Sequence, residues 1–201
     1  MKKFEGIIIN NLKNLQEMEN NNIRICFAGV PAVILPLVSY MKKKNKKFNF
    51  SNGIYWTGGG GWKTLDGREI NKNDFLKTIY EHFGIKKESW REAYMAAESN
   101  LWAVNCEGHY FHVPSPMYPF VLDDEMEPLL YGSEGRFAFL DPSANSYPGF
   151  IVTEDKVKLL DYCPSCDRPG PVLAPEITRM PGAEVRGCAA AMAKVISEME
   201  E

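Results

Sequence analysis

Four consecutive glycines are the feature that most constrains how this chain of 201 residues can fold. They lie in the stretch Thr57-Gly58-Gly59-Gly60-Gly61-Trp62-Lys63, directly after the apolar run Ile54-Tyr55-Trp56. Because glycine lacks a Cβ, such a turn can take positive φ and a ligand can lie directly on its peptide groups. A glycine-rich turn between a strand and a helix is the usual nucleotide-binding feature of an α/β sheet. For the glycines alone, a flexible surface loop is an equally good interpretation.

The segments before this turn predict a βαβ unit. Residues 23–29 have the composition of a buried strand, and residues 48–56 return as a second one. Between them, residues 32–44 have helical spacing, with Pro31 placed well for a helix first turn. Such units imply a parallel sheet covered by helices. The basic run Lys42-Lys43-Lys44-Asn45-Lys46-Lys47 is interpreted as the solvated end of the helix.

Two further helices are predicted on either side of this unit. Residues 4–20 place Ile8, Leu12, Leu15 and Met18 on one stripe. Residues 74–83 form the second helix, which Asn73 is expected to cap and Gly84 to end. Its inward-facing residues are expected to be Phe75, Leu76, Ile79, Tyr80 and Phe83.

The predicted secondary structure changes near Tyr94, from α/β to β-rich. Short β-type runs, separated by Pro and Gly, follow at 110–113, 118–122, 136–140, 150–153 and 157–160. Residues 189–200 then favour a short C-terminal helix. We therefore predict an α/β portion (1–95), a β-rich portion (96–178) and a tail with one helix (179–201).

Composition excludes several classes of protein. A hydrophobic content of 45% with 24% charged residues is typical of a packed globular protein. The net charge of −3 and the lack of a strongly basic face argue against nucleic acid as the main partner. No apolar run approaches the roughly 20 residues that span a bilayer. Five cysteines, an odd number, without a visible export signal predict a reducing, cytoplasmic location and no disulfides.

Three of the five cysteines have the spacing of metal ligands. Cys106 lies close to His109 and His112, and Cys163 and Cys166 form a Cys-x-x-Cys pair some fifty residues later. Two such clusters on β-type segments predict a tetrahedral structural zinc site, since thiolate and imidazole ligands favour zinc over magnesium or calcium. The alternative is a set of unrelated thiols and a surface histidine pair. The spacing leaves open whether His109 or His112 is the ligand.

The remaining cysteines differ in their surroundings. Cys26 lies inside the first predicted strand, where a buried thiol is expected. Cys188 follows Gly187 at the start of the C-terminal helix, with Arg186 beside it. The free N–H groups and dipole of a helix start lower the pKa of a thiol, and a thiolate is a good acyl acceptor. A small residue that packs the helix is the alternative.

Several motifs occur together in one order. They are 57–63, Tyr94-Met95-Ala96-Ala97-Glu98, Ser146-Tyr147-Pro148-Gly149-Phe150-Ile151-Val152-Thr153-Glu154-Asp155, Cys163-Pro164-Ser165-Cys166-Asp167-Arg168-Pro169-Gly170, Arg179, and Arg186-Gly187-Cys188-Ala189. From about Ile23 to its end, the chain resembles the acyl-protein synthetases of the bacterial luminescence fatty-acid reductase complex. It resembles more loosely the phenylacetate–CoA ligases and other adenylate-forming enzymes. The resemblance implies a portion of the large domain of those enzymes.

The resemblance also implies roles for single residues. In adenylate-forming enzymes the glycine turn, here Gly59 to Gly61, lines the adenine pocket. The tyrosine that matches Tyr94 stacks on adenine, and the glutamate that matches Glu98 helps to hold Mg²⁺. Asp155 matches the aspartate that binds the ribose hydroxyls, and Arg179 the arginine before the C-terminal part. Ala97 departs from the family, which has threonine there.

For the reaction, the resemblance implies two steps with ATP. A fatty acid forms an acyl-adenylate, and Cys188, at the position of the acylated cysteine of the synthetases, takes the acyl group for delivery to a reductase partner. Some relatives among the phenylacetate–CoA ligases carry a similar Cys…His…Cys-x-x-Cys pattern, which also favours zinc. The match of Phe111-His112-Val113-Pro114 to the family favours His112 over His109 as the ligand. A CoA ligase fragment, in which Cys188 is only structural, and a non-catalytic zinc-stabilised binding module are the alternatives.

One family feature is missing from these 201 residues. The Ser/Thr/Gly-rich phosphate loop of the family lies upstream of the motifs above, and no stretch before Ile23 matches it. We therefore expect the chain to correspond to the C-terminal part of the family's large domain.

Overall fold

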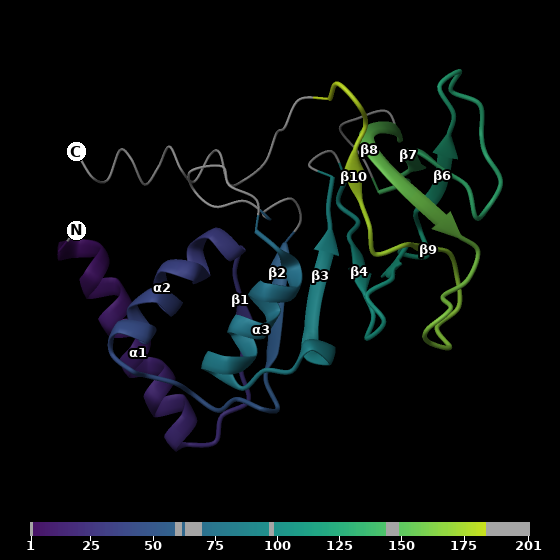
Figure 1. Cartoon of the computed structure of the whole chain (residues 1–201). Coiled ribbons are helices and arrows are strands. Elements are labelled where there is room, and N and C mark those ends of the chain that lie inside the picture. The colour runs from purple at the N-terminus through teal and green to yellow at the C-terminus, as the bar shows by residue number, and fades with distance from the viewer. Residues whose placement is uncertain (1, 59–61, 63–69, 97–98, 144–148, 184–201) are drawn as a thin grey trace. The chain divides into compact units, whose positions relative to one another are not determined.

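The computed structural model describes residues 2–58, 62, 70–96, 99–143 and 149–183, which form two compact units (Figure 1). Unit 1 extends to Trp90, and unit 2 begins at Arg91. Each unit has a hydrophobic core of its own. The C-terminal helix predicted for 189–200 lies outside the described residues, and the three-part division of the chain remains a prediction.

Unit 1 contains the predicted βαβ unit. Strand β1 (Cys26–Ala28) pairs in parallel with β2 (Ile54–Gly58), and helix α2 (Pro31–Lys43) connects them. Pro31 occupies the first turn of α2, where its missing N–H costs no hydrogen bond. The second strand begins later than predicted, because the N–H groups of Phe48 and Phe50 instead donate to His82 O and Phe83 O, at the end of helix α3 (Lys72–Phe83).

Helix α1 (Lys2–Asn20) precedes β1 and buries the predicted stripe of Ile8, Leu12 and Leu15. Met18, predicted on the same stripe, is exposed. The basic run ends α2 as predicted: Lys42 and Lys43 lie exposed in its last turn, where a cation is stabilised by the helix dipole. No helix among the described residues is both long enough and apolar enough to cross a membrane.

Helix α3 (Lys72–Phe83) follows β2 and begins two residues earlier than predicted. Asn71, and not Asn73, is its N-cap, because the Asn71 side chain accepts the N–H of Asp74 at 3.1 Å. Gly84 ends the helix with φ +70°, as predicted. Tyr80 is exposed although an inward position was predicted, whereas Phe75, Leu76, Ile79 and Phe83 are buried as expected.

The prediction of a buried thiol at Cys26 is wrong. Cys26 and Ala28 are exposed, whereas Ile25 is buried and Phe27 half-buried. Successive side chains of a strand point to opposite faces, so the core takes only the alternate set. The apolar composition of residues 23–29 did not reveal which set that would be.

Unit 2 is built from short antiparallel strands in the order β3-β4-β5-β9-β8-β7-β6, with β10 paired to β8. Their bounds are β3 (Trp90–Tyr94), β4 (Ala103–Asn105), β5 (Phe111–His112), β6 (Tyr118–Leu122), β7 (Glu134–Leu140), β8 (Phe150–Leu160), β9 (Val172–Leu173) and β10 (Thr178–Arg179). The α/β portion followed by a β-rich one is the fold class predicted from the sequence.

Strand β8 is the longest strand and the centre of unit 2. It joins the two predicted runs at 150–153 and 157–160 into one strand of 11 residues. It pairs with β7 along its length, with β9 at its end and with β10 in between, and the register with β7 shifts between Arg136 and Ala138. The core of the unit lies on one side of this pairing and includes Phe137, Phe139 and Val157.

Gly84 gives a direct test of the fold of unit 1. Its φ of +70° disfavours any side chain, and an added Cβ would also lie 2.8 Å from Asn49 Oδ1. We expect Gly84→Ala to lower the free energy of unfolding by about 1 kcal/mol for the backbone conformation and by about 1 kcal/mol more for the overpacking. Urea unfolding followed by circular dichroism measures both.

Gly132→Ala is the matched control, because Gly132 has φ +92° but nothing within 4 Å of an added Cβ. It should lose only the backbone contribution. Equal losses for the two variants would show that Gly84 is not packed against Asn49.

Candidate metal centre and nucleotide-binding residues

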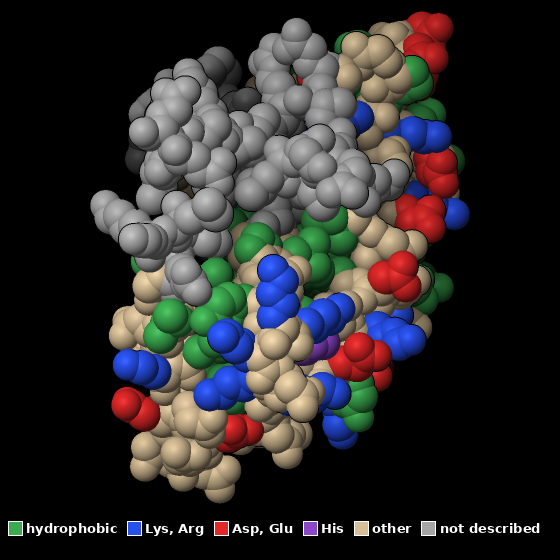
Figure 2. All heavy atoms as spheres, turned by 60° about the vertical axis from the view of Figure 1, so that its left-hand side comes forward, with side chains coloured by type: hydrophobic (Ala, Val, Ile, Leu, Met, Phe, Trp, Pro, Cys, Tyr) green, Lys and Arg blue, Asp and Glu red, His purple; other side chains and the backbone are tan. Residues whose placement is uncertain are grey.

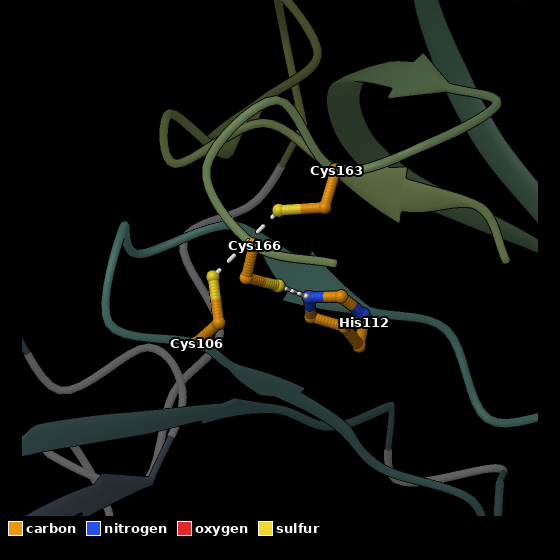
Figure 3. Close-up of side chains that lie close together, drawn as sticks. All are labelled: Cys106, His112, Cys163 and Cys166. Atoms are coloured by element: carbon orange, nitrogen blue, oxygen red, sulfur yellow. Dashed lines mark hydrogen bonds between the residues drawn. The ribbon is translucent and has the colours of Figure 1, made fainter. Parts of the chain in front are cut away.

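Four side chains of unit 2 converge to form a cluster of metal-ligating type. Cys106, His112, Cys163 and Cys166 each direct one ligand atom inward, and these atoms all lie within 4.8 Å of one another (Figure 3). Cys106 and Cys163 are buried, and the other two are partly buried. The cluster contains the four residues expected from the two cysteine-containing motifs and the choice of His112. We call it the Cys3His cluster.

Two connections between strands and one strand end place these side chains. Cys106 directly follows β4, His112 ends β5, and Cys163 and Cys166 lie in the connection from β8 to β9. The turn after Cys106 is tight: the N–H of Cys106 donates to Tyr110 O at 3.0 Å. A Cβ on Gly108 would lie 1.9 Å from Ser165 Oγ, so this close approach of the two connections requires glycine.

The structure shows which of the two histidines, His109 or His112, belongs to the cluster. His112 Nε2 lies 3.3 Å from Cys166 Sγ, inside the cluster. His109 turns instead toward Asn105, with 3.5 Å between His109 Nδ1 and Asn105 Nδ2, and its φ of +67° belongs to the turn. His112 therefore supplies the fourth ligand-type atom, and His109 shapes the turn that carries Cys106.

The spacing of the sulfur and nitrogen atoms fits a tetrahedral ion. With Zn–S bonds of about 2.3 Å, the sulfurs of a tetrahedral site lie roughly 3.8 Å apart. Cys106 Sγ and Cys163 Sγ are 3.8 Å apart. Three thiols and one imidazole are the ligand types of structural zinc sites. Four protein ligands would fill the tetrahedral coordination sphere and leave no position for a substrate.

The pKa shifts of Cys106 and Cys163 favour the thiolate, which is the form that binds a metal ion. Burial alone raises the pKa of Cys106 and of Cys163, but hydrogen bonds from Ser165 and from backbone groups bring each pKa below its ordinary value. For Cys166, a backbone hydrogen bond at Arg168 lowers the pKa, but burial and the neighbouring Cys163 and Cys106 sulfurs raise it overall. Three thiolates this close repel one another, and a bound metal ion removes that cost.

Ion pairs join the two connections that carry the cysteines of the Cys3His cluster. Glu107, next to Cys106, forms ion pairs with Arg91 at the start of unit 2 and with Arg168, which follows Cys166 by two residues. The Glu107 pKa is lowered, first by a backbone hydrogen bond and then by the two guanidinium groups. The pairs are largely exposed, so their contribution to stability is small; their effect is to orient the two cysteine-bearing connections.

A second cluster of side chains contains three of the residues predicted to bind the nucleotide. Tyr94 Oη donates to Asp155 Oδ2 at 2.7 Å, and Arg179 Nη1 donates to Asp155 Oδ1 at 2.8 Å. Arg179 also pairs with Glu154 at 2.8 Å. These residues are far apart in sequence and come from β3, β8 and β10, with Arg179 directly opposite Asp155 in the β8–β10 ladder. The structure therefore brings three of the predicted site residues into one network.

The electrostatics of this network follow from burial and charge. Burial of the Tyr94 ring raises its phenol pKa, and the Asp155 carboxylate raises it further, so the hydroxyl remains a donor at neutral pH. A hydrogen bond to Asp155 raises the pKa of Arg179. Asp155 is therefore a carboxylate held between a donor hydroxyl and a cation, an arrangement suited to exchange one of its partners for a ribose hydroxyl.

Sequence reasoning missed a third polar group, centred on the buried Asp141. Its carboxylate accepts hydrogen bonds from Ser99 Oγ at 2.8 Å, from the Asn100 N–H at 3.3 Å, and from the Ser143 N–H at 2.9 Å. The hydrogen bond from Ser143 lowers the Asp141 pKa, against the effect of burial. Asp141 thus fixes the chain directly after Glu98 to the end of β7. Asp-Pro-Ser at 141–143 is a turn signal, but nothing in it points to Ser99.

The remaining predicted site residues lie outside the described part of the chain: Gly59, Gly60, Gly61, Glu98 and Cys188. Their described neighbours are well fixed. β2 ends at Gly58, so the four-glycine stretch begins at a strand end, as predicted. The buried Thr57 accepts a hydrogen bond from Trp90 Nε1 at 3.0 Å, and Trp62 packs edge-on against Phe75.

Comparison with known proteins connects the two motif groups to one family. The family model described as "Acyl-protein synthetase, LuxE" matches residues 5–197. The long-chain-fatty-acid–luciferin-component ligase of Aliivibrio fischeri is 30% identical over 190 residues, which cover 93% of this chain and 50% of that protein. The ligase of the same name from Vibrio harveyi is 28% identical over 188 residues, 92% of this chain and 49% of that protein. The chain therefore spans about half the length of these relatives.

Solved structures show the same fold at lower identity. An open conformation of 2-hydroxyisobutyryl-CoA ligase, in complex with 2-HIB-AMP and CoA, matches with a TM-score of 0.63 and 16% identity, covering 84% of this chain and 36% of the ligase. A long-chain-fatty-acid-CoA ligase from Archaeoglobus fulgidus matches with a TM-score of 0.53 and 15% identity, covering 83% and 36%. The predicted fold and the resemblance are confirmed: this chain belongs to the acyl-protein synthetase family.

Proposed function

We propose that this chain forms part of an acyl-protein synthetase that activates a fatty acid with ATP and transfers the acyl group to Cys188. The observation that carries the proposal is the family match over residues 5–197, which includes the Gly187-Cys188 motif. The names of the two bacterial relatives, long-chain-fatty-acid–luciferin-component ligases, support a long-chain fatty acid as the substrate.

The proposed reaction has two steps. An oxygen of the fatty-acid carboxylate attacks the α-phosphorus of ATP, pyrophosphate leaves, and a mixed anhydride with AMP forms. The Cys188 thiolate then attacks the anhydride carbonyl, AMP leaves, and a thioester remains for a reductase partner. Mg²⁺, held with the help of Glu98, would neutralise phosphate charge in the first step.

The described residues support the nucleotide part of this proposal. Asp155 presents a carboxylate between Tyr94 and Arg179, and ribose hydroxyls are donors that such a carboxylate accepts. Tyr94 would supply a ring for adenine, and Arg179 a cation for phosphate charge. Gly59 to Gly61, which follow the end of β2, would let the nucleotide approach the backbone.

Two other functions compete with this one. A CoA ligase would use the same adenylate but pass the acyl group to CoA, with Cys188 only structural. A non-catalytic module would retain the Cys3His cluster as its main feature. The family match favours the synthetase, and acylation of Cys188 distinguishes it from both.

We infer further that the Cys3His cluster holds one structural zinc ion. The reasons are the three thiols and one imidazole, the 3.8 Å sulfur spacing, and the repulsion that three neighbouring thiolates would otherwise create. The ion would join the β4–β5 and β8–β9 connections. The β8–β9 connection extends from β8, the strand that carries Asp155, so the zinc would stabilise the nucleotide site indirectly.

The zinc prediction is checked by elemental analysis of protein purified without added metal, which should contain one zinc per chain. Cys163→Ser should lose the ion and several kcal/mol of the stability of unit 2, a fraction of the roughly 10–16 kcal/mol with which structural sites bind zinc. Cys26→Ser is the matched control, since Cys26 is exposed and outside the cluster. Protein with little metal and with Cys106, Cys163 and Cys166 freely reactive would refute the site.

The acyl-transfer prediction can be tested on this chain alone by supplying a long-chain fatty acyl-adenylate. Intact mass should rise by one acyl group, and neutral hydroxylamine should remove it, because a thioester is cleaved under conditions that spare an oxygen ester. Cys188→Ser should abolish the adduct or leave a hydroxylamine-resistant ester. Cys26→Ser, which removes an exposed thiol, should leave the adduct unchanged.

Two results would count against Cys188 as the acceptor. One is a hydroxylamine-labile adduct that persists in Cys188→Ser. The other is acylation of added CoA in place of the protein, which would favour the CoA ligase.

A further inference from the structure

The net charge of −3 conceals a strong division of charge along the chain. Residues 1–90 contain 15 Lys and Arg against 8 Asp and Glu, a net charge of +7, whereas residues 91–185 contain 6 against 15, a net charge of −9. The total charge, on which the prediction of no strongly basic face depends, therefore hides the positive charge of residues 1–90. On the surface that unit 1 forms in Figure 2, blue lysine and arginine side chains lie around green hydrophobic ones.

Unit 1 carries an open cavity of about 360 Å³ that combines these two properties. It lies between α3 and the 3₁₀ turn Lys87–Ser89. Leu76 and Tyr80 give it apolar walls, and Lys77, Lys86 and Lys87 surround it with exposed ammonium groups. Lys87 Nζ donates to Asn73 Oδ1 at 3.4 Å, and Glu88 is the one carboxylate in its lining. We call this cavity the lysine pocket.

Unit 2 carries a segment of the complementary chemistry in the connection from β6 to β7. This acidic turn, residues 123–131, has the sequence Asp-Asp-Glu-Met-Glu-Pro-Leu-Leu-Tyr. Its carboxylates at Asp124, Glu125 and Glu127 are exposed. Met126 is 51% exposed, and Leu130, at 85%, is the most exposed of the large apolar side chains described. Leu129 and Tyr131 are exposed as well, so the turn presents several neighbouring apolar side chains, and such a patch marks a binding surface.

The acidic turn is held in a defined shape. Asp123 Oδ1 accepts the N–H groups of Glu125 at 3.0 Å and Glu127 at 2.8 Å. Leu129 N–H donates to Val121 O at 2.7 Å, which closes the turn onto β6. Its side chains are therefore presented by a preformed backbone, and little conformational entropy is lost when a partner binds.

We propose that the lysine pocket of one copy of this chain binds the acidic turn of a second copy. Leu130 and Met126 would contact Leu76 and Tyr80, while carboxylates of the turn would pair with Lys77, Lys86 and Lys87. A second copy is the occupant because one chain carries both halves of the contact, with matched charge and matched apolar side chains. The contact joins two different surfaces, so association proceeds head to tail and either closes into a ring or continues.

The proposal is independent of the acyl-transfer reaction, and its test measures only mass. Sedimentation velocity over a concentration series at low salt should show association, and high salt should weaken it, because exposed charges are screened. Lys77→Glu with Lys86→Glu, or Asp124→Lys with Glu125→Lys, should each weaken association at least tenfold. Asp123 is left intact, since it shapes the turn.

Mixing the two charge-reversed proteins is the decisive step. Each alone opposes like charges, but the mixture contains one native pocket and one native turn and should associate again. Lys13→Glu with Lys42→Glu controls for loss of positive charge elsewhere on unit 1. Leu130→Ser should weaken association, whereas Tyr162→Ser, which removes another exposed apolar side chain, should not.

A chain that stays monomeric at every concentration would overturn the proposal, and would leave the lysine pocket to a different acidic protein. Association that neither charge reversal alters, or a mixture that fails to restore it, would also overturn it.

Discussion

The pairing of β8 is the constraint on which the rest of unit 2 depends. This strand of 11 residues bonds to β7, β9 and β10, and no other strand of unit 2 joins so many neighbours. It carries Asp155 in its middle, opposite Arg179, and delivers Cys163 three residues beyond its end. A slip of one residue in its register would turn Asp155 to the other face and separate it from Tyr94.

Much of this arrangement was predictable from local patterns. The βαβ unit follows from the apolar spacing of residues 23–56, and the end of α3 follows from Gly84, because few other residues adopt positive φ there. The cluster of Cys106, Cys163 and Cys166 was predictable because metal-ligand chemistry restricts both residue type and spacing. Such signals are short-range or chemically specific, and they do not depend on knowing the tertiary structure.

The parts that were not predictable are local choices between equivalent residues, or they depend on long-range contacts. The choice of Asn71 over Asn73 as the cap changes only where a helix begins, and the two residues have the same propensity. A continuous apolar run does not show which face of a strand is buried. Cys26 was therefore predicted on the buried face of β1, although it is exposed. Two of the four hydrogen bonds at Asp141, those from Ser99 and Asn100, join segments about forty residues apart.

The measurement that most directly tests the central claim, that Tyr94, Asp155 and Arg179 form a nucleotide site, is calorimetric titration of the chain with AMP. The account predicts binding that Asp155→Ala weakens at least tenfold, or about 1.4 kcal/mol. Asp161→Ala, which removes an exposed carboxylate of the same unit, should bind as the unaltered chain does. Equal affinity of all three proteins, with folding intact by circular dichroism, would contradict the account.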